Sequence, residues 1–410
     1  MKRCFAALLA LLLLTLAACG GRQEHSPSSA PDSAAAEPVP APAPPPESVP
    51  SPEELAARAA AEEAARREQA LRALLDGMSA EEKVGQLFFV RCPAAGAEED
   101  IRTYHLGGVL LFGRDYQDGS GAWLGAEEFA AKLARYQAAA ADTGVPLFIG
   151  SDEEGGTVTR ASRNPNLFAA RFPSPQQLFR SGGLDGLADA TAAYCAALRT
   201  LGVNVNFAPV CDVSTDTDDF IFARSFGQDA AATAEYAARA VGAMRAAGMA
   251  ATLKHFPGYG NNVDTHTGVA FDARPYAQFE TEDFLPFAAG VAAGAEFVLV
   301  SHNVVACMDD ALPASLSPAV HAVLRSALGF DGVILTDDLA MGAVAAYAKD
   351  GSAAVLAVLA GNDMLVTTDY KTQIPQVLAA VADGTVPPDT LDAAVLRVLR
   401  TKLALGLLEV

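Results

Sequence analysis

Eight short apolar segments recur along the chain, and their regular spacing constrains the fold more than any other feature. Each has five to seven residues and is rich in Val, Ile, Leu and Phe, as expected for strands that are buried on both faces. The segments are residues 86–90, 107–112, 146–151, 203–209, 251–256, 296–301, 332–337 and 363–367. Alanine-rich stretches with helical spacing lie between or after them, among them 126–141, 186–201, 229–248, 316–328, 342–359 and 389–405. This alternation predicts parallel strands joined by helical crossovers.

Eight strand–helix units favour an α/β fold of the (β/α)8 TIM-barrel type over residues 78–410. A doubly wound open sheet is the alternative fold. It is weakened because neither a G-x-G-x-x-G motif after the first strand nor a P-loop occurs in the sequence. In a barrel of this kind, functional residues gather at the carboxyl ends of the strands.

The first 18 residues have the pattern of a secretory signal peptide. Lys2 and Arg3 precede an apolar run that ends in small residues, and the run is too short for a membrane-spanning helix. The sequence LAAC ends at Cys19 and resembles the lipobox of bacterial lipoproteins, in which the cysteine becomes the lipidated first residue. The alternative is an ordinary signal peptide that happens to contain a cysteine. We expect an exported protein that is anchored by lipid at Cys19 to a cell membrane or envelope.

Two segments separate this signal from the barrel. Ten of the 24 prolines lie within residues 22–52, so we expect residues 19–52 to form a disordered tether. Residues 53–77 are charged and alanine-rich, and they predict a helix that is either a solvated stalk or a docking element. The net charge of −20 argues against a nucleic-acid partner. We expect a monomer that meets the membrane only through its lipid.

Four cysteines remain once Cys4 and Cys19 are set aside. They are Cys92, Cys195, Cys211 and Cys307. In an exported protein they could form two disulfides, but their wide spacing is equally consistent with free thiols.

Polar residues collect where the predicted strands end. The third strand runs into SDEEGGTVTR, the fifth ends at Lys254 and His255, and the seventh ends at Asp337. The opposite ends of the same strands carry Gly and Pro but few titratable groups. This asymmetry indicates an enzyme.

The stretch LTDDLAM offers two carboxylates directly after a strand. Asp338 is explained by a helix start, where an acid interacts favourably with the positive end of the helix dipole. Asp337 lies closer to the strand tip and is expected in the mouth of the barrel. There it could act as a nucleophile, a base or a metal ligand.

The stretch KHFPGYGNNVDTHT, residues 254–267, predicts a bent loop that carries acid–base chemistry. Pro257 and two glycines favour a turn. Asp264 and His266 are two residues apart, so a hydrogen bond from the imidazole to the carboxylate would orient the ring for proton transfer. His255 could instead be a buried core histidine, and the loop could be an ordinary polar surface loop. A metal hydrolase is a further alternative, but the first strand ends in VRCP and offers no His-x-His ligand pair.

Together these motifs resemble glycoside hydrolase family 3, and within it the β-N-acetylglucosaminidases. Residues from about 78 to 410 carry MSAEEKVGQLFFV, GGVLLF, DEEGGTVTR, NVNFAPVCDV, ARSFG, KHFPGYG, DTH and TDDLAM in the order found in the family. The resemblance implies a barrel, a retaining β-N-acetylhexosaminidase activity, and no metal or organic cofactor. Combined with the export signal, it implies β-linked N-acetylglucosamine in peptidoglycan fragments as the substrate.

The resemblance also assigns roles to individual residues. Asp337 matches the nucleophile, His266 the acid/base, and Asp264 its dyad partner. The residues that match sugar-binding positions are Asp152, Arg160, Arg224, Lys254 and His255.

Two features depart from the family pattern. Tyr259 occupies a position where the family usually has histidine, and the loop from Lys254 to His266 is one residue shorter than usual. Alternatives within the family are an exo-β-glycosidase for other sugars or a phosphorylase. An alternative outside the enzymes is a sugar-binding lipoprotein with weakened catalysis.

Overall fold

The computed structural model describes residues 51–260, 262, 270–345, 347–348 and 352–410. The expected signal peptide, nearly all of the expected tether, Cys19, Asp264 and His266 lie outside the described residues. One compact unit comprises residues 56–410.

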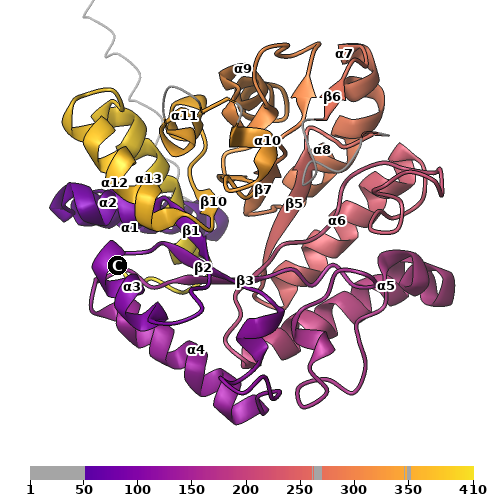
Figure 1. Cartoon of the computed structure of the whole chain (residues 1–410), viewed down its shortest axis with the longest axis horizontal. Coiled ribbons are helices and arrows are strands. Elements are labelled where there is room, and N and C mark those ends of the chain that lie inside the picture. Colours follow the sequence, from indigo (N-terminus) through magenta and orange to yellow (C-terminus); the bar gives the residue numbers. More distant parts are fainter. Residues whose placement is uncertain (1–50, 261, 263–269, 346, 349–351) are drawn as a thin grey trace, which may run out of the picture. The chain divides into compact units, whose positions relative to one another are not determined.

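The eight predicted strands all form, and they make one parallel sheet in the order β10-β1-β2-β3-β4-β5-β7-β9. They are β1 Phe88–Arg91, β2 Gly108–Leu111, β3 Phe148–Ser151, β4 Val205–Asn206, β5 Ala250–Phe256, β7 Phe297–Val300, β9 Val333–Thr336 and β10 Leu365–Thr367. A bridge between Leu335 and Met364 joins the outermost strands β9 and β10. The sheet therefore curls into a barrel, as Figure 1 shows, and the predicted (β/α)8 fold is confirmed.

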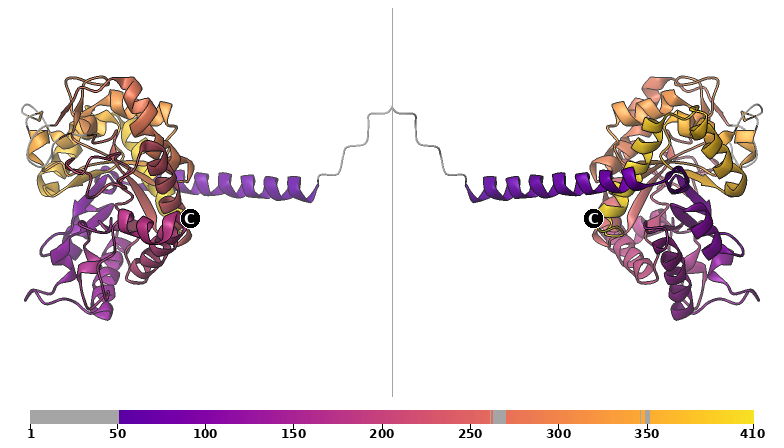
Figure 2. Two further views of the ribbon diagram at one scale, coloured as in Figure 1. Left: turned by 90° about the vertical axis from the view of Figure 1, so that its right-hand side faces the viewer. Right: turned by 90° about the vertical axis from the view of Figure 1, so that its left-hand side faces the viewer.

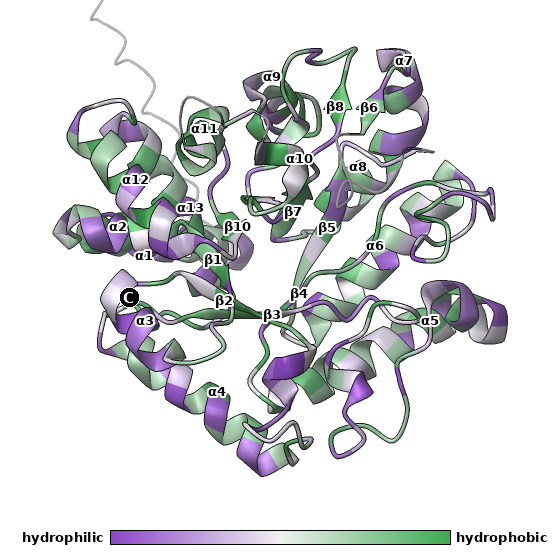
Figure 3. Cartoon of the chain, viewed as in Figure 1, coloured by the Kyte–Doolittle hydropathy of each residue, from purple (hydrophilic) through white to green (hydrophobic). Residues whose placement is uncertain are grey.

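The barrel interior is apolar because the strands are buried on both faces. Phe89 meets Phe207 edge to face at 5.2 Å between ring centroids, and Phe148 meets Phe297 in the same way at 5.1 Å. Figure 3 shows hydrophobic residues concentrated along the central strands, with hydrophilic residues on the outer faces of helices. Apolar side chains thus fill the barrel, and the polar groups lie at the ends of the strands.

Helices surround the sheet (Figure 1). They are α2 Ala80–Gln86, α3 Ala97–Tyr104, α4 Ala126–Ala141, α5 Pro175–Thr200, α6 Ala230–Ala246, α7 Tyr276–Gln278, α8 Phe284–Ala292, α9 Pro318–Ala322, α10 Gly342–Ala345, α11 Ala353–Ala360, α12 Tyr370–Ala382 and α13 Pro388–Ala404. Short helical turns are η1 Gly113–Tyr116, η2 Ala161–Arg163, η3 Phe279–Asp283, η4 Ala314–Leu316 and η5 Val323–Ala327. A second sheet, absent from the sequence prediction, pairs β6 Phe271–Asp272 with β8 Val304–Val305.

Local signals explain where several helices begin. Ser174 caps α5 in a reciprocal arrangement with Gln177, so α5 starts at Pro175, and a break at Gly183 (φ 64°, ψ −163°) separates its first part from the part predicted over 186–201. The predicted helix over 316–328 is confirmed as α9 and η5, which follow one another without a break from Pro318 to Ala327. Ser317 caps its start, and Pro318 suits the first helical position because proline has no backbone N–H.

Helix α1, Pro52–Gly77, is the charged alanine-rich segment. Figure 2 shows that its C-terminal part lies against the barrel domain. Leu71 and Leu75 are buried there, and Arg400 pairs with Glu68 at 2.8 Å (Nε to Oε2) and 2.5 Å (Nη2 to Oε1). Residues 56–62 of the same helix are exposed. Within unit 56–410, α1 is therefore a docking element at one end and solvated at the other.

Two further findings concern the cysteines and the length and hydrophobicity of the helices. Cys92, Cys195 and Cys211 are buried free thiols, and Cys307 is an exposed one, so the disulfide alternative is wrong for these four residues. Among the described residues, none of the helices has the length and apolar character needed to cross a membrane.

Candidate active site

A cavity of about 330 Å³ opens at the carboxyl ends of the barrel strands. Its walls include Asp337 and all five residues predicted to bind the sugar: Asp152, Arg160, Arg224, Lys254 and His255. They come from the ends of β3, β5 and β9 and from the segment after β4, and the barrel brings them together because parallel strands end on one face.

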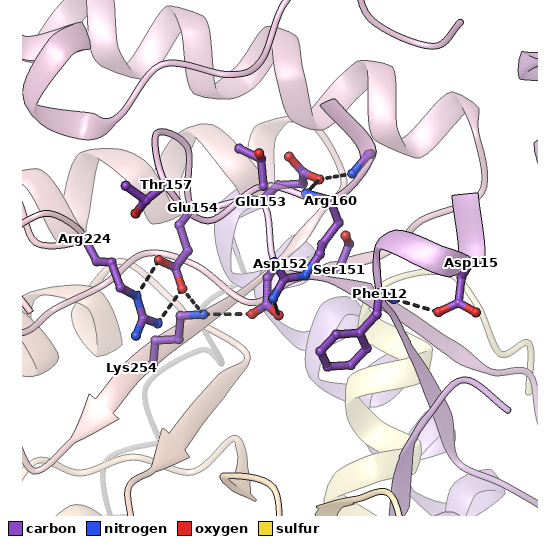
Figure 4. Close-up of polar contacts among 12 residues, drawn as sticks. Phe112, Asp115, Ser151, Asp152, Glu153, Glu154, Thr157, Arg160, Arg224 and Lys254 are labelled. Atoms are coloured by element: carbon purple, nitrogen blue, oxygen red, sulfur yellow. Dashed lines mark hydrogen bonds and ion pairs between the residues drawn. The ribbon is translucent and has the colours of Figure 1, made fainter. Parts of the chain in front are cut away.

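Three consecutive acids follow β3. Because successive side chains of an extended chain point to opposite sides, the middle acid points away from the other two. Asp152 and Glu154 face the cavity. Glu153 between them is buried on the other side, where it accepts hydrogen bonds from the backbone N–H groups of Arg160 (2.6 Å) and Ala161 and from Ser162 Oγ (3.0 Å). Glu153 thus fixes the loop that carries Arg160, while Asp152 and Glu154 face the cavity (Figure 4).

Lys254 connects the two cavity-facing acids. Its Nζ lies 2.9 Å from Asp152 Oδ1 and 2.5 Å from Glu154 Oε1, and the lysine side chain is only 3% exposed. Arg224 binds Glu154 with both Nε (3.0 Å) and Nη2 (2.8 Å), as Figure 4 shows. Burial by itself would raise the pKa of Glu154, but the attraction of Arg224 and Lys254 outweighs it and holds that pKa well below its usual range. Glu154 is therefore a carboxylate that fixes both cations in place.

His255 is held at both ring nitrogens. Its Nδ1 lies 2.7 Å from Asp212 Oδ2, and its Nε2 lies 3.1 Å from Arg224 Nη2. Because a guanidinium only donates, Nε2 accepts and Nδ1 donates to Asp212, which assigns a neutral ring in one tautomer. His255 is 5% exposed and also lines the cavity. The side chain is therefore buried, as the core-histidine alternative expected, and it is also part of the candidate site, as predicted.

Tyr259, at the position where the family usually has histidine, is buried at the cavity wall. It is 2% exposed, clusters with Val210 and Ile221, and meets the His255 ring edge to face at 5.5 Å. Asp212 accepts the Tyr259 backbone N–H at 2.7 Å. The tyrosine ring therefore packs directly against a residue of the candidate site.

Asp337 follows β9 directly and lines the cavity. Its backbone N–H donates to Val300 O at 3.0 Å, and its Oδ1 accepts the Asp338 N–H at 2.8 Å. The prediction that Asp338 starts a helix is wrong, since α10 begins only at Gly342. Asp338 instead accepts from the Ala340 N–H (2.9 Å) and from Thr368 Oγ1 (2.9 Å), and so ties the end of β9 to the segment after β10.

The residues on both sides of segment 263–269 are tied together by Arg274. It contacts Asp272 through three side-chain hydrogen bonds of 2.8–3.1 Å and Asp283 through one of 2.8 Å, and it reaches Gly258 O at 3.4 Å. Asn262 Nδ2 also donates to Asp272 Oδ2 at 2.8 Å. Asp264 and His266 lie outside the described residues, so their dyad stays a prediction. In the described ranges, no group of three or more His, Cys, Asp or Glu side chains could hold a metal ion.

Four site residues escaped the sequence prediction: Arg91, Phe112, Glu154 and Asp212. Glu154 could have been found, because it is two residues beyond Asp152 on a strand end and therefore shares its face. Arg91 and Phe112 stack, with the guanidinium carbon 4.3 Å from the ring centroid, but they come from different strands. No local pattern pairs such residues.

Glu153 should make stability depend on pH. Burial is the main cause that raises its pKa from 4.5 to about 7. Because the folded state binds this proton more tightly than the unfolded chain, its stabilising contribution is fully present below pH 4.5 and is lost as the pH rises through about 7. The Glu153→Gln variant cannot titrate, and its amide can still accept from the backbone and donate to Ser162 Oγ.

We therefore expect the variant to gain up to about 3 kcal/mol relative to the wild type between pH 4.5 and pH 7.5. Urea unfolding at four pH values across this range measures the difference. Parallel pH profiles for the two proteins would contradict the raised pKa.

Comparison with known proteins places the chain in a family. Residues 79–401 match the family described as "Glycosyl hydrolase family 3 N terminal domain". The chain is 32% identical over 338 residues to the β-hexosaminidase LpqI of Mycobacterium tuberculosis, a match that covers 79% of this chain and 83% of that protein. It is 30% identical over 354 residues to a β-N-acetylglucosaminidase/β-glucosidase of Cellulomonas fimi, covering 82% and 60% of the two chains.

A solved family 3 β-N-acetylglucosaminidase from Paenibacillus sp. str. FPU-7 superimposes with a TM-score of 0.73 at 30% identity. The match covers 81% of this chain and 63% of that one.

Proposed function

The chain belongs to glycoside hydrolase family 3, and we propose that it is a retaining β-N-acetylhexosaminidase that removes terminal β-linked N-acetylglucosamine. One observation carries this proposal: Asp337 shares a single cavity with five ionic and imidazole side chains that are already locked by mutual contacts. Such a preorganised set of donors and acceptors suits the hydroxyl groups of one sugar ring. The names of the relatives add the N-acetyl sugar as the expected glycone.

The proposed mechanism has two steps. In the first, Asp337 attacks the anomeric carbon and forms an ester with the sugar, while His266 gives a proton to the departing oxygen. In the second, His266 takes a proton from water, the water oxygen bonds to the anomeric carbon, and the ester bond to Asp337 breaks. Asp264 orients the His266 ring in both steps. Two displacements at one carbon retain the β configuration.

The direct test is release of nitrophenol from its β-N-acetylglucosaminide by residues 53–410, with the β-glucoside as control. We expect turnover of the first substrate and little of the second. Comparable turnover of both would favour the broader β-glycosidase that the Cellulomonas relative's name describes. Binding of N-acetylglucosamine without turnover of either substrate would favour the sugar-binding alternative. Phosphate-dependent formation of a sugar phosphate would favour a phosphorylase.

The acid role of His266 predicts a dependence on the leaving group. Nitrophenolate departs without a proton, whereas a sugar alkoxide does not. We expect His266→Ala to slow cleavage of chitobiose by about 10²-fold or more beyond its effect on the nitrophenyl glycoside. Equal losses on the two substrates would contradict an acid role.

The proposed address is the cell envelope, with peptidoglycan fragments as the source of the sugar. Residues 1–18 and Cys19 support this through their pattern. We expect Cys19→Ala to move the protein from the membrane fraction to the soluble fraction after cell lysis, because its lipid would be missing. Membrane association that survives the substitution would argue against lipid anchoring.

A further inference from the structure

Two open grooves have lining residues that lie within two positions of sugar-cavity residues along the chain. One, which we call the arginine groove, has a volume of about 740 Å³ and is lined by residues 156–157, 171–174, 177–178, 180–181 and 223. Its Thr157 directly precedes Val158 of the sugar cavity, and its Ala223 directly precedes Arg224 of that cavity. Figure 4 shows Thr157 on the same loop as Glu154. A group attached to a sugar in the cavity can therefore extend along this groove.

The arginine groove has an unusual charge for this protein. Among the described residues that line it, only Arg171 and Arg180 are ionisable, although the chain has 49 acidic residues and a net charge of −20. The other groove, of about 770 Å³, mixes cations with four carboxylates: Glu98, Asp115, Asp118 and Glu128. Of the two, only the arginine groove offers positive charge without a competing acid.

Both arginines are exposed and available. Within the part of the chain that the structure describes, neither forms an ion pair or a side-chain hydrogen bond. The cavity arginine Arg224, in contrast, is held by Glu154. Two guanidinium groups without partners attract an anion, and the planar fork of each matches a carboxylate.

The floor of the groove is rigid. The Gly156 N–H donates to Phe172 O at 2.8 Å, and a Cβ at Gly155 would lie 2.2 Å from Pro173 O. The reciprocal cap between Ser174 and Gln177 fixes the start of α5, the helix that carries Arg180. Arg180 is thus presented from α5, and Arg171 precedes Phe172, whose carbonyl accepts the Gly156 N–H.

We propose that the arginine groove binds a carboxylate on the leaving-group portion of the substrate. This inference rests on the proposed function and goes beyond it, because it assigns two residues to the choice of leaving group. The carboxylate can be on the sugar next to the scissile bond or on a substituent of that sugar. Each exposed arginine–carboxylate contact contributes modestly, so the pair together is expected to change affinity by about tenfold.

Binding is measured by calorimetry on the full chain carrying Asp337→Asn, which holds the substrate without turning it over. The ligands are N-acetylglucosaminyl-N-acetylmuramic acid, its methyl ester, and the same disaccharide with an acidic dipeptide on the carboxyl group. The first and third carry negative charge at different distances from the scissile bond, and the ester carries none. The test variant adds Arg171→Gln and Arg180→Gln. The control adds Arg102→Gln and Arg239→Gln, which remove the same charge from exposed ion pairs on α3 and α6.

We expect at least one charged ligand to bind more tightly than the ester, and the test variant to weaken only that binding, by about tenfold. Which charged ligand responds identifies the position of the carboxylate. The preference should also shrink as salt is raised. The inference is wrong if neither charged ligand is preferred, or if the preference survives in the test variant or falls equally in the control. Failure of the proposed function looks different: the chain with Asp337 intact would then cleave neither chitobiose nor the nitrophenyl glycoside.

Discussion

Asp337→Asn is expected to lower kcat on nitrophenyl β-N-acetylglucosaminide by about 10³-fold or more, with little change in the stability of the protein. The amide cannot form the glycosyl ester, and loss of a nucleophile removes the whole covalent route. The fold should survive because asparagine keeps the Oδ1 that accepts the Asp338 N–H at 2.8 Å. Steady-state kinetics beside thermal unfolding measures both effects.

Asp338→Asn is the matched control. It changes the neighbouring acid, which ties β9 to Thr368 and is a positioning residue at most. We expect a much smaller loss of kcat than for Asp337→Asn. If the two variants lose activity equally, or if Asp337→Asn retains more than a tenth of it, Asp337 is not the nucleophile.

Lys254→Met should be the most destabilising substitution in the cavity. The lysine is 2% exposed and neutralises Asp152 and Glu154, so its removal leaves two close carboxylates in a largely buried site. Breaking a buried ion pair from one side costs about 3–5 kcal/mol. Methionine keeps most of the volume, so the loss reports on charge rather than on a cavity. Urea unfolding at pH 7 gives the free energy difference.

The control for this substitution is Arg239→Met, which breaks an exposed pair with Asp185 at 3.1 Å. We expect its free energy of unfolding to stay close to that of the wild type. The addition of Glu154→Gln to Lys254→Met should recover part of the lost stability, because it removes one of the stranded charges. If the double variant is less stable than Lys254→Met alone, charge burial is not the cause.

Much of the fold follows from local sequence. The eight apolar segments predict β1–β5, β7, β9 and β10, because a strand buried on both faces needs a continuous apolar run. The short pair β6 and β8 escaped prediction, since each has only two residues and is held by its partner. The part of α5 before Gly183 was missed although a Ser–Pro cap marks its start, because the alanine-rich composition begins only after that residue.

Some residues of the candidate site could likewise be predicted from local sequence, and others could not. Residues at strand ends, such as Asp152 and Asp337, could be selected because a barrel places all carboxyl ends on one face. Asp212 could not be predicted as a site residue in this way, because its role is a 2.7 Å contact with His255, which comes from another strand end. The same holds for Arg91 on Phe112 and for the two arginines of the arginine groove. Such pairs are created by the approach of distant segments.

Sequence by itself determined the barrel, the identity of the cavity-facing strand ends, and the expectation of an exported chain. The period of apolar residues and the chemistry of short motifs carry that information locally. Only the tertiary structure decided which charges neutralise one another, which tautomer His255 adopts, and that Arg171 and Arg180 have no acidic partner among the described residues. Those properties depend on distances of about 3 Å between residues far apart in the chain, and no local pattern encodes such distances.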